Sequence, residues 1–198
     1  MASQTWVNLL NAGVPWQTVQ GTLLNTATTA TISPQAGGPQ DFVLPSQPTG
    51  LQWYAGMVLR VTARGLLTSG GTTSSLTMNV SAGPSAGAGT ALVTTGAIPL
   101  GTTTLTAQVF KLEVIIRVIA LTTAAATFLD AQGDLTLTAG TTPTLTTASG
   151  AVAPLAYTLT NGSTLSPYTA ATALFLRGTL SAAFGSVQCN QFLIEQMC

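Results

Sequence analysis

Charged side chains are scarce in this sequence, and histidine is absent. The 198 residues include five Lys and Arg and five Asp and Glu, so that 5% of the chain is charged, against about 25% in a typical soluble domain. Without histidine, the Ser-His-Asp and Cys-His arrangements of hydrolases have no general base, and metal sites lose their commonest ligand. We therefore expect a protein that is not an enzyme and that needs no cofactor or metal.

Basic patches and long apolar runs are missing as well. The five basic residues are scattered and matched by five acids, whereas nucleic-acid contact requires clustered Lys and Arg. The start, MASQTWVNLL, lacks the basic residues and apolar core of a signal peptide, and no uncharged apolar run reaches the length of a membrane helix. We expect a protein made in the cytoplasm that contacts neither nucleic acid nor membrane.

Cysteine is rare, and both copies, Cys189 and Cys198, lie near the C-terminus. Two are too few for a disulfide scaffold and have no nearby zinc ligands, so we expect free thiols. Cys189 as a nucleophile is the alternative, but nothing close to it in the sequence lowers its pKa. Its alternation with Val187 and Leu193 indicates a packed residue instead.

Threonine replaces much of the missing charge. The chain has 36 Thr residues, which favour strands because they are β-branched and which form hydrogen bonds without a charge. A surface with so few charges and no net charge promotes self-association. We expect other protein to cover most of this surface in the functional state.

The run FKLEVIIRVIAL, from Phe110 to Leu121, carries three of the ten charges inside the most hydrophobic part of the chain. Its even positions are apolar, while Lys111, Glu113 and Arg117 share the odd face with isoleucines. This period of two predicts a strand whose inner face is core and whose outer face holds the charges.

The same alternation predicts further strands along the chain, with Leu59, Val61 and Met78 on apolar inner faces and Arg60 and Arg64 on a polar face. MVLRVTARGLL and SLTMNVSA are expected to form a hairpin through the turn TSGGTTSS. TFLDAQGDLTLTA is expected to be a strand with a kink at DAQGD. Other predicted strands are TVQGTLLNTATTATI, DFVL, TALVTT, TALFLRGTL and VQCNQFLIEQM. About eight to ten strands separated by turns predict an all-β, two-sheet antiparallel β-sandwich.

We assign residues 21-198 to this sandwich and residues 1-20 to a short N-terminal arm. The arm includes the best helix candidate, Thr5 to Gly13, which has a Thr cap and a terminal glycine. Trp6 and Trp16 of the arm are expected to contact other protein. Trp53 and Tyr54 in QWYAG are expected to pack at a sheet edge or at a subunit contact, with a carbohydrate groove as the alternative.

Two carboxylates in FLDAQGDL, Asp130 and Asp134, are interpreted as turn residues around Gly133. A calcium site and a catalytic acid and base are the alternatives. The stretch GAGTAL, Gly87 to Leu92, lacks the third glycine of a dinucleotide fingerprint and is expected to be a flexible loop.

Lys111, Glu113 and Arg117 have three interpretations: an anionic-ligand site, an exposed cross-strand ion pair, or charges that set the register with a neighbouring subunit. Because Ile115 and Ile119 share their face, we favour the subunit contact.

From about Leu51 to Gly140, the sequence resembles virion proteins of tailed bacteriophages. The resemblance is carried by MVLRVTARGLLTSGGTTSSLTMNVSAGPSAGAGTALVTTGAIPL, which contains a strand ending in ARG, a Ser/Thr/Gly turn, the strand SLTMNV and the segment GTALVTTGA. It continues in FKLEVIIRVIALTTAAATFLDAQGDLTLTAG, a long apolar strand followed by a Gly-containing one. The resemblance implies a jelly-roll or tumour-necrosis-factor-like sandwich, often trimeric, in the head or tail of a virus particle.

These observations lead to one favoured function and two alternatives. We expect a capsid decoration or minor head protein, located in the virion, that binds the major capsid protein and copies of itself as a trimer. The first alternative is a tail or head-fibre domain that recognises a host surface glycan. The second is a glycan hydrolase that uses Asp130, Asp134 or Glu113. A shell-forming capsid protein that packages nucleic acid ranks lower, because such proteins usually carry a basic arm.

Overall fold

The computed structural model describes residues 7–8, 21–33, 42–44, 55–70, 74–85, 88–100, 105–121, 127–138, 158–159, 172–183 and 185–197. Every regular element in these ranges is a β-strand, which confirms the all-β class. The strands are β1 (Val7–Asn8), β2 (Thr29–Thr31), β3 (Phe42–Leu44), β4 (Val58–Ser69), β5 (Ser74–Ser85), β6 (Ala88–Thr94), β7 (Ile98–Leu100), β8 (Leu105–Leu121), β9 (Thr127–Thr138), β10 (Thr158–Leu159), β11 (Thr172–Leu180) and β12 (Gly185–Gln196). Among these residues no helix is long and apolar enough to cross a membrane.

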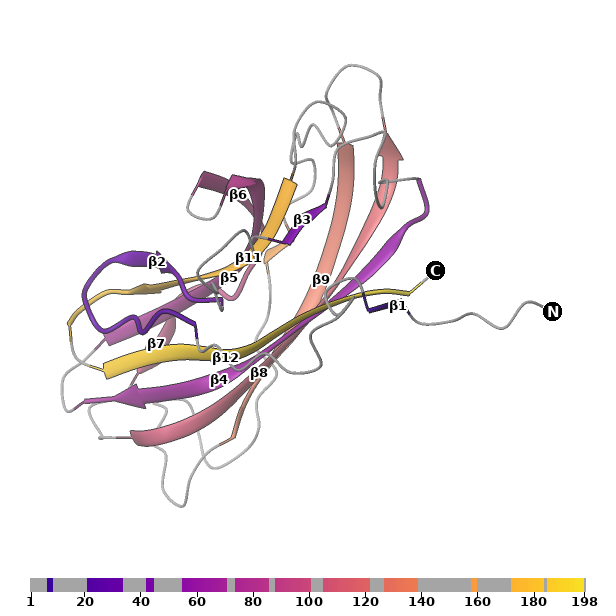
Figure 1. Cartoon of the computed structure of the whole chain (residues 1–198). Helices are drawn as coiled ribbons and strands as arrows, with labels where there is room; N and C mark the ends of the chain where they lie inside the picture. Colours follow the sequence, from indigo (N-terminus) through magenta and orange to yellow (C-terminus); the bar gives the residue numbers. More distant parts are fainter. Residues whose placement is uncertain are drawn as a thin grey trace.

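The strands form two antiparallel sheets (Figure 1). Sheet A has five strands in the order β1-β12-β4-β8-β9. Sheet B has seven strands, with the order β10-β6-β5-β11-β2, while β3 pairs with β11 and β7 pairs with β5. The two sheets pack as a sandwich, so the predicted two-sheet architecture is confirmed.

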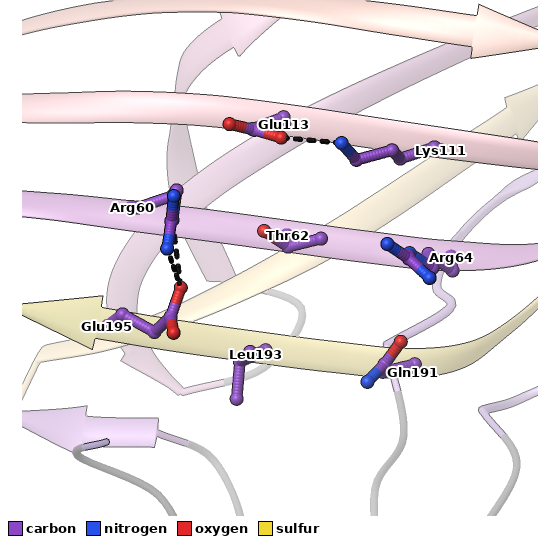
Figure 2. A pocket seen from close by; sticks show the side chains of 8 residues that line it. All are labelled: Arg60, Thr62, Arg64, Lys111, Glu113, Gln191, Leu193 and Glu195. Atoms are coloured by element: carbon purple, nitrogen blue, oxygen red, sulfur yellow. Dashed lines mark hydrogen bonds and ion pairs between the residues drawn. The ribbon is translucent and has the colours of Figure 1, made fainter. Parts of the chain in front are cut away.

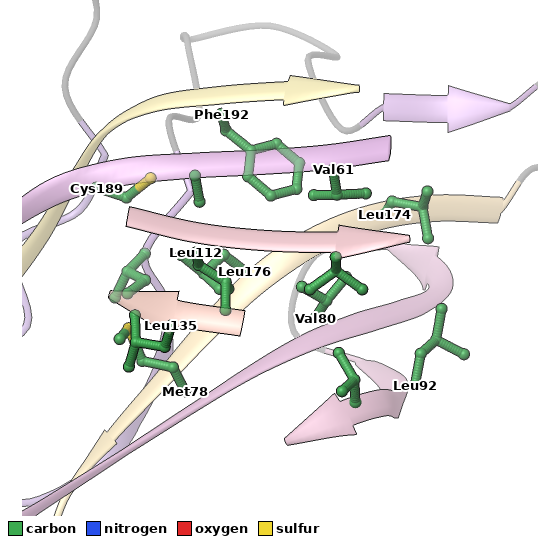
Figure 3. Packing of buried hydrophobic residues seen from close by; sticks show 14 of the residues in the cluster. Val61, Met78, Val80, Leu92, Leu112, Leu135, Leu174, Leu176, Cys189 and Phe192 are labelled. Atoms are coloured by element: carbon green, nitrogen blue, oxygen red, sulfur yellow. The ribbon is translucent and has the colours of Figure 1, made fainter. Parts of the chain in front are cut away.

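The core lies between the sheets because each long strand turns its apolar positions inward. In β4, burial alternates residue by residue, with Leu59, Val61 and Ala63 fully buried. Burial alternates in the same way along β8. The apolar residues of β4 and β8 pack against the inner faces of β5 and β11 in sheet B. Figure 3 shows side chains from both sheets meeting in this layer, among them Val61, Leu112, Phe192, Val80 and Leu176. Each such side chain contributes about 1.5–3 kcal/mol through burial.

The predicted hairpin between MVLRVTARGLL and SLTMNVSA is wrong. Strand β4 pairs with β12 on one edge and β8 on the other, whereas β5 pairs with β6, β7 and β11 in the opposite sheet. The chain therefore crosses from one sheet to the other between β4 and β5. Apolar and polar residues alternate in the same way along both strands. This alternation predicts which face of a strand is buried, but it does not predict which strand lies beside it.

Strands β8 and β9 are neighbours in a long antiparallel pair, from Val109 opposite Thr138 to Leu121 opposite Thr127. The register shifts between Val118 and Ala120 and is unbroken along the DAQGD segment. The predicted kink is therefore wrong, and Asp130 and Asp134 are strand residues rather than turn residues. Gly133 has a different role: a Cβ there would lie 2.5 Å from the Glu113 carbonyl oxygen and 2.8 Å from Val114 Cγ2.

A β-bulge in β12 changes which side chains face the core. The register with β4 shifts between Cys189 and Gln191, so that Val187 and Cys189 before the shift and Phe192 and Ile194 after it are all buried. Leu193 consequently lies on the outer face, and its predicted alternation with Cys189 is wrong. One extra residue is enough to reverse the faces of a strand.

Three other local predictions differ from the structure. Val7–Asn8 of the expected helix is a short strand that pairs with Glu195 and Gln196 of β12, so the helix is wrong at these two residues. The expected loop GAGTAL is largely strand, since β6 begins at Ala88. The run TVQGTLLNTATTATI contributes only the three residues of β2 as a strand within its described part.

Candidate assembly surface

Eight of the ten charged residues lie on one surface, the outer face of sheet A, which we call the charged face. The charged face contains Arg60 and Arg64 from β4, Lys111, Glu113 and Arg117 from β8, Asp130 and Asp134 from β9, and Glu195 from β12. Of the remaining two, Arg177 belongs to sheet B and Asp41 lies outside the described residues. Four positive and four negative groups leave the charged face without net charge.

The strand register places like charges opposite one another at the centre of the charged face. Arg64 of β4 is directly opposite Lys111 of β8, and Glu113 of β8 is directly opposite Asp134 of β9. Opposed side chains on one face of a sheet are about 5 Å apart, and like charges there destabilise the pairing. The centre of the charged face therefore has a positive half beside a negative half.

Two ion pairs connect charges within the described part of this surface (Figure 2). Lys111 Nζ lies 2.8 Å from Glu113 Oε2 along β8, and Arg60 Nη2 lies 2.8 Å from Glu195 Oε2 across β4 and β12. Neither Arg64 nor Arg117 forms an ion pair with a described residue. Because the Lys111 and Glu113 side chains are 43% and 37% exposed, their pair adds little to stability in the isolated chain.

The hydrogen bond from Lys111 is the main reason why the pKa of Glu113 lies below its usual value of 4.5. The positive charges of Lys111, Arg60 and Arg64 act in the same direction, while partial burial of the carboxylate opposes them. A carboxylate in this setting stays ionised at neutral pH, and it can serve as an acceptor for a cation from outside.

We expect the pKa of Glu113 to make stability depend on acid. Its pKa is lower in the folded chain than in the unfolded chain, so the stabilisation is complete above about pH 4.5 and is lost as the pH falls through the lowered folded value. Glu113→Gln, and to a smaller extent Lys111→Gln, should flatten the fall of the melting temperature between about pH 5 and pH 3. If the melting temperature of Glu113→Gln falls between pH 5 and pH 3 as steeply as that of the wild type, this assignment is wrong.

Two shallow grooves of about 290 and 350 Å³ run across the charged face. The first lies between β12, β4 and β8 and includes Arg64, Gln191 and Leu193; the second lies between β8 and β9 and includes Arg117 and Gln132. Both are open and lined by strand side chains, which suits a broad protein contact better than an enclosed small ligand.

Asp130 and Asp134 are four residues apart in one strand, so their Cα atoms are separated by about 13 Å. This spacing does not bring the two carboxylates together as an acid and base. Within the ranges that the structure describes, no group of three His, Cys, Asp or Glu residues could hold a metal ion.

Exposed apolar side chains adjoin the charges. Leu66 of β4 and Val109 of β8 are directly opposite one another and are 37% and 46% exposed. Ile119, 53% exposed, lies on the far side of Arg117. Ile115 is half-buried between the charged positions. An outer face that mixes paired charges with exposed Val, Leu and Ile has the composition of a contact surface.

Cys189 lies in the core and is not part of this surface. Its side chain is buried, as predicted, and its thiol donates a hydrogen bond to the Gln191 carbonyl oxygen, with the sulfur 3.1 Å from that oxygen. Burial raises the pKa of the thiol to about 12, although hydrogen bonds from the backbone of Gln191 and Arg64 offset part of the effect.

We therefore expect Cys189 to be inert in the folded protein. A thiol with a pKa of about 12 has almost no thiolate at pH 8, and the core excludes reagents. In a Cys198→Ser variant, a disulfide reagent should modify no thiol until denaturant is added, and one thiol afterwards. Rapid modification of the folded variant would overturn the prediction.

The seven residues proposed from sequence for an assembly interface are only partly described. Lys111, Glu113 and Arg117 lie together on the outer face of β8, as the period of two predicts. Trp6, Trp16, Trp53 and Tyr54 lie outside the described residues. The contribution of β4, β9 and β12 to the same surface was not predicted. Alternation placed Arg60 and Arg64 on a polar face, but only the strand order shows that this face adjoins Glu113.

Comparisons with models of protein families, with curated proteins and with solved structures find no match to this chain. The two-sheet antiparallel sandwich is therefore established by strand pairing and burial alone.

Proposed function

We propose that this protein is a structural component of a tailed-bacteriophage particle, and specifically a capsid decoration or minor head protein that binds the outer shell and stabilises it. The observation that carries the proposal is the distribution of charge. Eight charges lie on the outer face of one sheet, and the described part of the other outer face is almost neutral. Such a molecule has one outer face rich in charge and one with little charge, and we infer that both contact neighbouring proteins.

The outer face of sheet B supports the proposal. It carries Thr29, Thr77, Asn79 and Thr179, with Arg177 as its one described charge. The hydroxyls of Thr29 and Thr179 hydrogen-bond to each other at 2.8 Å, which satisfies them without water. Removing this face from water desolvates few charged groups, because Arg177 is the one charged residue among its described positions.

A structural role on a virus particle accounts for the charge distribution of the two outer faces and agrees with the sequence resemblance to virion proteins of tailed bacteriophages. Decoration proteins add stability by burying further surface on an assembled shell, and that role requires no catalytic base, metal or nucleic-acid contact. The partners in this proposal are the major capsid protein and further copies of this chain.

The test is the number of copies of this chain per purified virus particle, relative to the main shell protein, by quantitative mass spectrometry. A simple ratio to the shell subunit, with copies in the hundreds, would support decoration. About a dozen copies would indicate a vertex, neck or fibre and favour the glycan-recognition alternative. Absence from particles would overturn the proposal. The matched control is the main shell protein, measured in the same digest.

A further inference from the structure

We propose that the charged face binds the charged face of a second copy of this chain, about a two-fold axis that passes over Leu112 of β8. The proposal identifies one contact surface, its occupant and its symmetry. It depends on the residues of sheet A alone and does not require the role in a virus particle.

The outward residues of β8 are self-complementary about this axis. Around Leu112 they are Val109, Lys111, Glu113 and Ile115, in that order. The two-fold axis runs between the two facing sheets, parallel to them and perpendicular to β8. A half-turn about it reverses the order of the β8 residues, so that Lys111 meets Glu113 of the second copy and Val109 meets Ile115 of the second copy. Symmetry repeats each contact, which gives two charge pairs and two apolar pairs along a single strand.

Two charges on the neighbouring strands, Arg64 and Asp134, strengthen the match at its centre. Arg64 lies opposite Lys111 and enlarges the positive half of the surface, while Asp134 lies opposite Glu113 and enlarges the negative half. In one isolated copy, both arrangements place like charges side by side. The same half-turn brings the positive half of each copy over the negative half of the other, and the repulsion within each copy is then balanced by attraction between copies.

The neutrality of the charged face favours a second copy over a partner of a single charge. A strongly acidic partner would be attracted to Arg64 and Lys111 but repelled by Glu113 and Asp134. A strongly basic partner would be attracted to the two carboxylates and repelled by the two cations. The four central charges form a positive pair, Arg64 and Lys111, beside a negative pair, Glu113 and Asp134, and this arrangement is matched best by itself. The other four charges lie beside a charge of opposite sign within one copy, Arg60 with Glu195 and Arg117 opposite Asp130. The exposed Val109 and the half-buried Ile115 add apolar contact that charge steering alone lacks.

A two-fold contact predicts dimers, in contrast to the trimer that the phage resemblance implies. The two are distinguishable by mass, because the chain is 20.0 kDa. The contact should also weaken with salt, since charge pairs at a solvated interface are screened over about 10 Å at 0.1 M ionic strength.

The experiment is sedimentation equilibrium of the full-length chain at low and high salt, with three charge variants. Lys111→Glu and Glu113→Lys each place like charges in both symmetric contacts, so each should raise the dimer dissociation constant about tenfold or more. An equimolar mixture of these two variants should dimerise again, because every contact is then between opposite charges. The double exchange, Lys111→Glu with Glu113→Lys, should restore the dimer in a single chain.

The control is Thr77→Glu, which adds a negative charge to the outer face of sheet B and should leave the dimer unchanged. Circular dichroism melts establish that every variant is folded. A wild-type chain that stays monomeric at all concentrations would overturn the proposal, as would a trimer that the single variants do not affect. Failure of the double exchange to restore association would overturn the Lys111 and Glu113 pairing. None of these outcomes depends on the number of copies per particle.

Discussion

Replacing Gly65 by valine should reduce the free energy of unfolding by about 3 kcal/mol or more. Gly65 lies in β4, paired with Cys189 just before the bulge of β12. A Cβ at this position would overlap the Gln188 carbonyl oxygen and would lie 2.6 Å from Phe110 Cε1. The backbone of β12 is therefore as close as it is only because residue 65 has no side chain.

Urea unfolding followed by circular dichroism measures this effect. The matched control is Gly96→Asn, because Gly96 has a φ of 68° and open space around its Cα. Asparagine tolerates this left-handed conformation, so the control should change stability by less than about 1 kcal/mol. If Gly65→Val unfolds at the same urea concentration as the control, the close approach at the bulge is not a determinant of the fold.

Truncating Phe110 to alanine should cost about 3–5 kcal/mol. Phe110 is fully buried, stands on the inner face of β8 and covers Gly65 on the neighbouring strand. Removing its ring would leave a cavity next to a glycine, and a rigid sheet can close only part of it. Since domains of this kind are stable by about 5–15 kcal/mol, the variant would lose a large fraction of the total.

The comparison is Val109→Thr, one residue earlier on the opposite face of the same strand. Val109 is 46% exposed, and threonine keeps the β-branched shape, so a monomeric sample should lose less than about 0.5 kcal/mol. Equal losses at positions 109 and 110 would show that burial does not alternate along β8, which would contradict the sandwich itself.

The faces of the long strands were predictable from sequence because side chains alternate with a period of two whatever the neighbouring strand is. The rule assigned Leu59, Val61 and Met78 to the core, and it placed Lys111, Glu113 and Arg117 on one outer surface. It failed at Leu193, where the bulge in β12 interrupts the period. Beside that bulge the backbone of β12 comes close to Gly65 of β4, a residue that is more than a hundred positions away in sequence.

Neighbour relations were less predictable. The Gly-rich segment after β4 is compatible with a tight hairpin and with a crossing between sheets, and the structure has the crossing. Asp130 and Asp134 flank a glycine and so match a turn, yet Gly133 is there to admit the backbone of β8. In both cases composition indicates a special backbone position, while the contact that requires it comes from a distant strand.

The sequence by itself determined the all-β class, the alternation of buried and exposed positions and the low, balanced charge, since each follows from local residue chemistry. Only the tertiary structure decided that eight charges from β4, β8, β9 and β12 share one surface, and that four of them meet at its centre as one positive and one negative pair. The physical reason is that strand order and register are set by long-range packing of the whole core. Local alternation restricts that packing without selecting a single solution.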